Sequence, residues 1–257
     1  ASDVYKRQDL KYVIQQFKAE GITDLILDLR FNNGGSVELA RYLAASIAGT
    51  SHRSDVFMRM QRNSGADEYI RFGDGDDLNL KSVRIICSEE TASASELIIS
   101  GLRGIDFPVK LFGSRTEGKN VGMEVQEYKY GNKYYEFAPI TFRSFNAKDW
   151  GDYADGIDPD VMLNNQNSSY EDDIDNVFPY AFGDWDNFDF NYPLYWALCD
   201  VQGVDPTTGE PVKRSGRAGL TRSSKDEIIR VPSVPLKRPA GTFGSLIYNK
   251  PEVENLY

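Results

Sequence analysis

The spacing of apolar residues along the chain predicts an α/β fold. In residues 9–20 they recur three and four positions apart, which predicts an amphipathic helix. A continuous apolar run then predicts a buried strand over 24–30, glycines at 34 and 35 predict a tight turn, and helical spacing returns over 36–48. A turn at the carboxyl end of a strand is where open α/β sheets place their ligand sites.

The same signals predict further elements downstream. Strands are expected at 56–61, 83–87, 109–112, 121–130, 134–137 and 140–145, the last of these forming a β-rich segment, and a short closing helix is expected at 193–201. Between them the composition predicts connecting loops: an acidic, solvated loop at 73–77, a turn cluster at 153–160, a polar loop at 164–175 and an acidic, aromatic stretch at 184–189.

The 257 residues suffice for one large domain or two small ones. Residues 1–8 read as the translation of a sequencing-library adapter, so we set them aside and expect the natural N-terminus to be missing. We expect one folded domain over 9–203, truncated at its N-terminus. Prolines recur after Gly203, and residues 204–257 are predicted to be an extended, irregular tail.

Charge and composition exclude several functions. A net charge of −10 without a basic stripe argues against a nucleic-acid partner. No run approaches the roughly 18 apolar residues of a membrane span. Cys87 and Cys199 lie in apolar surroundings and are expected to be buried free thiols. Zinc-protease motifs need two histidines and the sequence holds one, His52, so no metal or other cofactor is expected.

The richest candidate for chemistry is the turn Thr91-Ala92-Ser93-Ala94-Ser95-Glu96, between the strand at 83–87 and a helical run. A serine there lies beside unpaired helix N–H groups, as an acyl-transfer nucleophile requires. The alternative is structural, because Ser93 and Glu96 also fit the S-x-x-E capping box. No G-x-S-x-G elbow is present, and nothing places His52 near this turn. The remaining candidate base is a lysine, Lys119, as in Ser-Lys enzymes.

A second interpretation concerns Gly113–Asn120, which nearly matches the phosphate-binding loop G-x-x-x-x-G-K-[ST]. The match fails at Asn120, where a hydroxyl must reach magnesium. The stretch that follows also reads as a strand, whereas a phosphate-binding loop opens a helix. Nucleotide binding therefore stays open as a weak alternative.

Three segments together resemble the core of the carboxyl-terminal processing (tail-specific) serine proteases. Asp28-Leu29-Arg30-Phe31-Asn32-Asn33-Gly34-Gly35 is similar to the family's D-L-R-x-N-x-G-G. The serine before Ala94-Ser95-Glu96 matches the family nucleophile, and Thr116-Glu117-Gly118-Lys119 is similar to T-[aromatic]-G-K, whose lysine is the general base. The three motifs occur in the family's order, and the lysine follows the serine by 26 positions.

The resemblance implies a role for each matching residue. Ser93 would attack the scissile carbonyl, and Lys119 would take the serine proton and later activate water. The N–H of Ala94, with that of Gly34 or Gly35, would form the oxyanion hole. Supporting positions are matched by three further residues: Glu96, Thr116 and, with an offset of one residue, Asp106.

The resemblance also implies a crotonase-like (ClpP-type) α/β core, polypeptide substrates, a peptide-binding PDZ module upstream, and an exported, periplasmic or cell-envelope location. The Lys-Asn-Val-Gly sequence after Gly118 looks most like exported, often lipid-anchored relatives in gut-type Bacteroidota. One departure is Glu117, which replaces the usual aromatic residue and bears on the shape of the groove and the charge of the lysine. A non-catalytic binding protein on the same fold remains the alternative, although it would be expected to lose the serine or the lysine.

Overall fold

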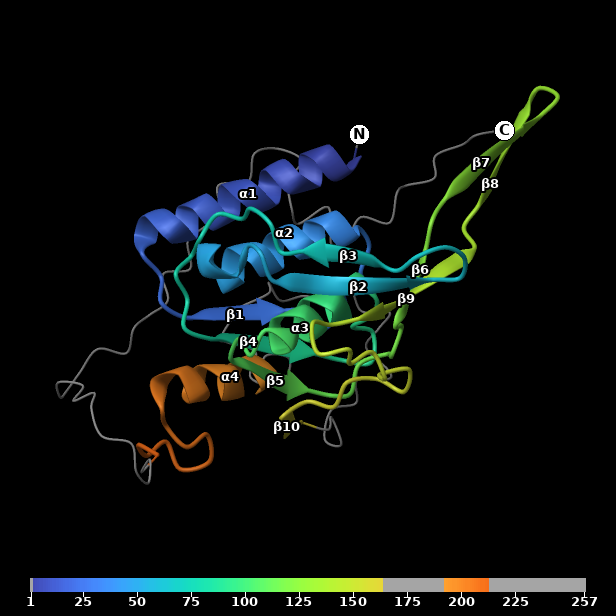
Figure 1. The fold of residues 1–257 in the computed structure, drawn as a ribbon. Helices are drawn as coiled ribbons and strands as arrows, with labels where there is room; N and C mark the ends of the chain where they lie inside the picture. Colours follow the sequence, from blue (N-terminus) through green and yellow to red (C-terminus); the bar gives the residue numbers. More distant parts are fainter. Residues whose placement is uncertain (1, 164–191, 213–257) are drawn as a thin grey trace, which may run out of the picture.

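The computed structural model describes residues 2–163 and 192–212, which form an α/β fold with two main sheets (Figure 1). The elements run in the order α1 (Ser2–Glu20), β1 (Leu25–Asp28), α2 (Val37–Ala48), η1 (Thr50–His52), β2 (Val56–Arg62), β3 (Glu68–Arg71), β4 (Val83–Cys87), α3 (Ala94–Gly104), β5 (Val109–Gly113), β6 (Val121–Met123), β7 (Gln126–Tyr130), β8 (Lys133–Phe137), β9 (Ile140–Phe145), β10 (Val161–Met162) and α4 (Tyr192–Gln202).

The first sheet is parallel, with the strand order β1-β4-β5-β10. Strand β4 lies inside it, and four of its five residues are buried, as is typical of a parallel strand covered on both faces. Strand β1 lies at the edge and is only half-buried, so the predicted buried strand is shorter and more exposed than expected. The carboxyl ends of β4 and β5 both lead into the loops that carry the candidate residues.

The second sheet is antiparallel, with the order β3-β2-β9-β6. Helix α3 packs between the two sheets, because it contacts β5 on one side and β2 on the other (Figure 1). Its residues are almost all buried, and Ile99 and Leu102 are fully enclosed in the main hydrophobic core. Helix α2 packs beside α3, and α1 covers α2.

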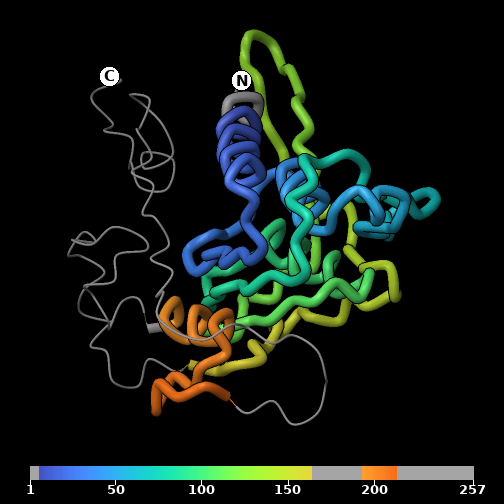
Figure 2. The backbone as a smooth tube through the Cα atoms, turned by 90° about the vertical axis from the view of Figure 1, so that its left-hand side faces the viewer, coloured from blue at the N-terminus to red at the C-terminus, as the bar shows by residue number. Residues whose placement is uncertain are grey.

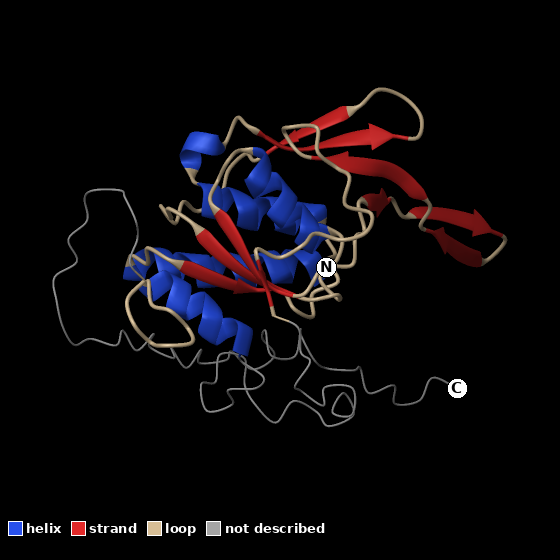
Figure 3. Ribbon diagram, turned by 90° about the horizontal axis from the view of Figure 1, so that it is seen from below, coloured by secondary structure: helices blue, strands red, loops and turns tan. Residues whose placement is uncertain are grey.

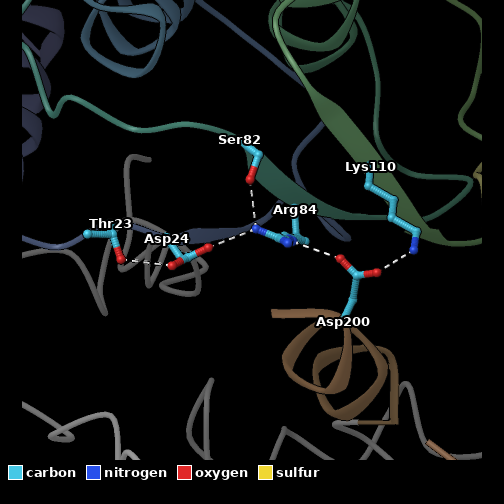
Figure 4. A network of polar contacts seen from close by, with 6 residues as sticks. All are labelled: Thr23, Asp24, Ser82, Arg84, Lys110 and Asp200. Atoms are coloured by element: carbon cyan, nitrogen blue, oxygen red, sulfur yellow. Dashed lines mark hydrogen bonds and ion pairs between the residues drawn. The ribbon is translucent and has the colours of Figure 1, made fainter. Parts of the chain in front are cut away.

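Helix α4 covers the other face of the parallel sheet, on the side of the molecule away from α1 (Figure 2). Asp200 on α4 accepts hydrogen bonds from Arg84 of β4 (2.9 Å) and from Lys110 of β5 (Figure 4). Arg84 also donates to Asp24 (3.0 Å) and Ser82 (2.8 Å). The predicted closing helix is therefore confirmed, and charged groups of the sheet hold it in place.

A two-stranded hairpin, β7–β8, projects from the second sheet as an arm (Figure 3). Residues 121–130 were expected to form one strand. The structure divides them into β6, which pairs with β9, and β7, which pairs only with β8. The predicted β-rich segment is present, but its strands belong to two separate sheets.

Other expectations differ from the structure at the edges of elements. The first helix begins at Ser2, so it includes most of residues 1–8, and the short strands β3 and β10 were not predicted. The loops expected at 164–175 and 184–189, and the tail beyond 212, lie outside the described residues. Residues 204–212 form a turn closed by a bridge between Val204 and Pro211. No described helix has both the length and the hydropathy that crossing a membrane requires.

Candidate active site

Ser93 occupies the turn between β4 and α3 in a strained backbone conformation. Its φ of 55° and ψ of −115° lie outside the regions that side-chain-bearing residues prefer, at a cost of about 1–3 kcal/mol. The flanking Ala92 and Ala94 are 1% and 4% exposed, so packing holds the turn in this shape. Such strain is concentrated at functional sites, which favours a role for Ser93 beyond capping the helix.

The loop after β1 is fastened to this turn by hydroxyl groups. Thr91 Oγ1 donates to the carbonyl of Leu29 (2.7 Å), and Ser95 Oγ donates to the carbonyl of Asn32 (2.9 Å). The N–H of Ala92 donates to the same Asn32 carbonyl (3.2 Å). From its sequence Asn32 was predicted only to be part of a tight turn. Its carbonyl also anchors the loop to the Ser93 turn, a contact that depends on the packing of the two loops.

Gly34 lies against the Ser93 turn so closely that only glycine fits. A Cβ built on it would lie 2.7 Å from both the Ala92 oxygen and the Ala94 nitrogen, and its φ is +93°. The N–H of Gly34 donates to Asn32 Oδ1 (3.0 Å). Within the described part of the chain, the N–H groups of Gly35 and Ala94 have no hydrogen-bond partner. These two amides are therefore the donors available to a ligand.

A single buried carboxylate joins the serine turn to the lysine loop. Glu96 is 0% exposed, and its Oε2 accepts the N–H groups of Ser93 (2.8 Å) and Lys119 (2.9 Å). Its Oε1 accepts the Thr116 hydroxyl (2.6 Å) and the N–H of Gly118 (2.8 Å). The backbones at positions 93 and 119 are thus held by two hydrogen bonds to the same oxygen atom.

The lysine loop is supported from behind by the turn predicted at 153–160. The Thr116 hydroxyl accepts the N–H of Ile157 (2.7 Å), and the Thr116 N–H donates to the Ile157 carbonyl (3.2 Å). Gly118 has a φ of +99°, and a Cβ there would lie 2.4 Å from the Ala154 oxygen. Glu117 points elsewhere: it is exposed and does not line the pocket described next.

Ser93 and Lys119 line one pocket of about 220 Å³, part of which is open solvent. The remaining lining residues are mostly apolar and come from α2, α3, β6 and β9: Val37, Leu97, Val121, Gly122, Phe142 and Ser144. The ring of Phe142 lies so close to Gly122 that a Cβ there would meet it at 1.9 Å. None of these lining residues carries a carboxylate; the Glu96 carboxylate lies behind them, bound to the backbones of Ser93 and Lys119.

Two candidates named from the sequence lie away from this pocket. Asp106 follows the far end of α3, where its side chain is 82% exposed and forms an ion pair with Lys148. None of the contacts described for Asp106 reaches the Ser93 turn. His52 lies in η1 and pairs with Asp55 (2.7 Å), in line with the expectation that it does not serve Ser93.

The phosphate-loop interpretation of Gly113–Asn120 is wrong. The N–H groups of Gly118 and Lys119 that would have to hold a phosphate are bound to the Glu96 carboxylate. Asn120 is 6% exposed, and its side chain donates to the Gly151 carbonyl (2.7 Å). A strand, β6, follows the loop in place of a helix.

The cysteines offer no competing nucleophile among the described residues. Both are free and buried, as predicted. Burial raises the pKa of the Cys87 thiol to about 12, so the reactive thiolate is scarce at neutral pH. The acidic loop at 73–77 belongs to no cluster of three metal-ligating side chains in the described part of the chain.

Known proteins resemble this chain in sequence and in structure. The sequence profile of "Peptidase family S41" matches residues 3–163. A "Probable CtpA-like serine protease" of Staphylococcus aureus (strain COL) is 26% identical over 181 residues, which cover 69% of this chain and 35% of that protein. A protein of the same name from Staphylococcus haemolyticus (strain JCSC1435) is 25% identical over 158 residues, covering 60% of this chain and 30% of that protein.

A solved structure shares the fold. The "Putative S41 protease" of Bacteroides fragilis NCTC 9343 superposes with a TM-score of 0.62 at 23% identity, covering 76% of this chain and 49% of that one. The α/β fold class predicted from the sequence is thereby confirmed. The chain spans about a third of the length of the curated relatives that it matches.

Proposed function

Because the chain belongs to peptidase family S41, we propose that it carries the catalytic core of a serine endopeptidase of the carboxyl-terminal processing type. Its substrates would be unfolded or C-terminally exposed polypeptides. One observation carries the proposal: Ser93 and Lys119 line the same pocket, and the backbones of both are fixed by the Glu96 carboxylate. This pairing supplies a nucleophile and a base on a preorganised support.

In the proposed reaction the Ser93 hydroxyl attacks the scissile carbonyl carbon while the neutral Lys119 amine takes its proton. The tetrahedral intermediate collapses to an acyl-enzyme, and Lys119 returns the proton to the departing amine. Lys119 then removes a proton from water, which attacks the acyl carbon. The second tetrahedral intermediate collapses with cleavage of the bond to Ser93 Oγ, Lys119 returns the proton to that oxygen, and the new carboxyl terminus is released.

The oxyanion would be bound by the N–H groups of Ala94 and Gly35. Both are unpaired in the described part of the chain, whereas the N–H of Gly34 is occupied by Asn32. Preorganised backbone donors of this kind typically contribute 10²–10³-fold to the rate. We therefore assign Gly35 as the second donor, and Gly34 as the glycine that permits the close approach of the two loops.

The first prediction concerns the dyad. Degradation of reduced casein by the full-length protein should fall by at least about 10³-fold in Ser93→Ala and in Lys119→Ala, because each change removes one partner of a unit. The exposed residues Ser51 and Lys81 provide matched controls, and Ser51→Ala and Lys81→Ala should retain activity.

Circular dichroism spectra must show that the two inactive variants are folded. Cleavage that persists in Ser93→Ala would overturn the assignment of the nucleophile. A folded wild type that binds casein without cleaving it would favour the alternative, a non-catalytic binding protein on the same fold.

The proposed setting of the enzyme follows from the family. We propose that the full-length protein is exported to the periplasm or cell envelope, and that it carries a PDZ module upstream of the core. Cell fractionation followed by immunoblotting would test the location. Recovery of the protein in the cytoplasmic fraction would contradict it.

A further inference from the structure

The β7–β8 hairpin is an arm whose ten strand residues are all exposed (Figures 1 and 3). Its two strands pair only with each other within the described structure. An isolated two-stranded hairpin is marginally stable in water. An exposed hairpin with this composition therefore points to a partner that covers it.

The two faces of the arm differ in chemistry. Residues directly opposite each other share a face, so the pairs Tyr128–Tyr135, Gln126–Phe137 and Tyr130–Lys133 define one face, which we term the aromatic face. The exposed fractions of Tyr128, Tyr130, Tyr135 and Phe137 are 61%, 71%, 42% and 56%. The opposite face holds Glu127 across from Glu136, and Lys129 across from Tyr134. Only the aromatic face is therefore mainly apolar, and its four aromatic side chains are left exposed by residues 2–163 and 192–212.

The aromatic arm is continuous with the candidate active-site pocket. In sequence it lies between β6 and β9, which pair with each other and contribute Val121, Gly122, Phe142 and Ser144 to the pocket lining. Three of the residues that join arm and pocket are exposed and apolar: Met123 is 45% exposed, Val125 68% and Ile140 54%. Glu124 lies between the first two and pairs with Arg62 of β2 (3.0 Å). An extended polypeptide on the arm would therefore have an apolar path toward Ser93.

The size of the aromatic face favours a strand-like ligand over a second copy of the chain. Five residues per strand at ~3.4 Å, and a width of two strands, give a footprint of roughly 17 by 10 Å. That is far below the ~800 Å² that each partner contributes to a standard protein interface. An extended polypeptide segment is narrow enough to lie along a face of this size. Tyrosines suit such a surface, because they bury large areas with little loss of conformational entropy.

We propose that the aromatic face is a docking surface for extended, apolar-rich segments of the polypeptide substrate, outside the pocket in which the bond is cleaved. The proposal rests on the proposed peptidase function. It predicts that the arm contributes affinity for long unfolded chains and leaves the chemical step unchanged. Short peptides that occupy the pocket alone should not depend on it.

The test measures binding separately from catalysis. In the full-length Ser93→Ala protein, the affinity for fluorescein-labelled reduced casein is measured by fluorescence anisotropy. Tyr135→Ser on the aromatic face should weaken binding about fivefold, the effect of a typical interface residue. Its neighbour Tyr134 lies on the opposite face, and Tyr134→Ser should change the affinity less than twofold. The combined replacement of Tyr128, Tyr130, Tyr135 and Phe137 by serine should reduce binding at least about 30-fold.

The outcomes separate docking from peptidase activity. With Ser93 restored, the combined variant should raise KM for casein and leave kcat, and the cleavage of short peptides, unchanged. Equal casein affinities in the Tyr135→Ser and Tyr134→Ser proteins, or no casein binding by the parent protein, would overturn the proposal. So would a change of oligomeric state in the combined variant by analytical ultracentrifugation, since the face would then be a contact between copies. If Tyr135→Ser weakens casein binding and Tyr134→Ser does not, but the wild type cleaves no casein, the docking surface would be supported and the proposed peptidase activity would be contradicted.

Discussion

Glu96 is the residue on which the geometry of the site depends most. Its carboxylate is 0% exposed and accepts four hydrogen bonds. If this carboxylate were removed, the N–H and O–H groups that donate to it would be buried without an acceptor. Each unpaired donor would lower the free energy of unfolding by about 1–3 kcal/mol. The residue that fixes Ser93 and Lys119 is therefore also one that the folded state cannot easily lose.

The isosteric change Glu96→Gln tests this dependence. In either orientation the amide NH₂ faces at least one backbone N–H, so we expect the free energy of unfolding to fall by about 2 kcal/mol. Urea denaturation at pH 7 would measure the change. The control Glu89→Gln removes the charge of an exposed residue and should stay within about 0.5 kcal/mol of wild type. Equal stability of the two variants would contradict the role of Glu96.

At this scale the sequence predicted only part of the site. The S-x-x-E pattern predicts the bond from the Ser93 N–H to Glu96, because both residues lie within one helical turn. The bonds from Gly118 and Lys119 to the same carboxylate span 22 and 23 residues, and no local rule predicts them. Asp106 matched a supporting position of the family only with a shift of one residue. In the structure it lies at the far end of α3 from Ser93.

Among the elements, α4 is distinctive because it lies beyond the residues that match the family profile. It covers the parallel sheet through Asp200, which meets Arg84 and Lys110 (Figure 4). Burial would raise the pKa of the Asp200 carboxyl, but hydrogen bonds from Lys110 and Arg84 outweigh it, so the pKa lies below its ordinary value of 3.8. The folded state therefore favours the ionised carboxylate.

This pKa shift gives the attachment of α4 a defined pH dependence. A carboxyl group with a lowered pKa stabilises the fold at pH values above its unfolded pKa of about 4, and the contribution is lost as pH falls through the lower folded pKa. Asp200→Asn should cost about 1 kcal/mol at pH 7. The difference from wild type should shrink below pH 4 in denaturation curves. Asp106→Asn, which alters an exposed ion pair, is the control. A constant difference between pH 7 and pH 3 would contradict the assignment.

The strands that could not be predicted from the sequence are those that form only because a neighbouring strand pairs with them. Glu68–Arg71 shows little apolar alternation, and it becomes β3 because it pairs with β2. Strand β10 has two residues and exists through its register with the end of β5. The division between β6 and β7 is likewise set by a change of partner from β9 to β8. In contrast, the strong apolar run of β4 and the helical spacing of α2 and α4 sufficed for prediction.

In the whole molecule, α3 is the shared layer between the two sheets. It lies tightly against the antiparallel sheet at Gly101, where an added Cβ would lie 2.6 Å from the ring of Phe57 on β2. Phe57 is 1% exposed and stacks edge-on against Phe72 at 5.3 Å. The second sheet can therefore pack on the helix only because position 101 has no side chain.

Gly101→Ala reverses the usual effect of helix propensity. An exposed helical glycine gains about 1 kcal/mol from this change. Here the methyl group overpacks the core, at a cost of about 1–3 kcal/mol, so we expect a net loss of stability and a lower Tm. Thermal denaturation would measure it. Adding Phe57→Leu to Gly101→Ala should recover part of the lost stability. If the stability changes of the two substitutions were simply additive, the proposed contact between positions 57 and 101 would be contradicted.

The Glu96 carboxylate also links the two sheets to each other. The turn at Ser93 follows a strand of the parallel sheet, whereas Lys119 leads directly into β6 of the antiparallel sheet. A small shear between the sheets would therefore separate the proposed nucleophile from the proposed base. Since both backbones are bound to one oxygen atom, such a displacement must first break hydrogen bonds in a water-free environment. The relative positions of the Ser93 and Lys119 backbones are thus held by hydrogen bonds that cross the boundary between the two sheets.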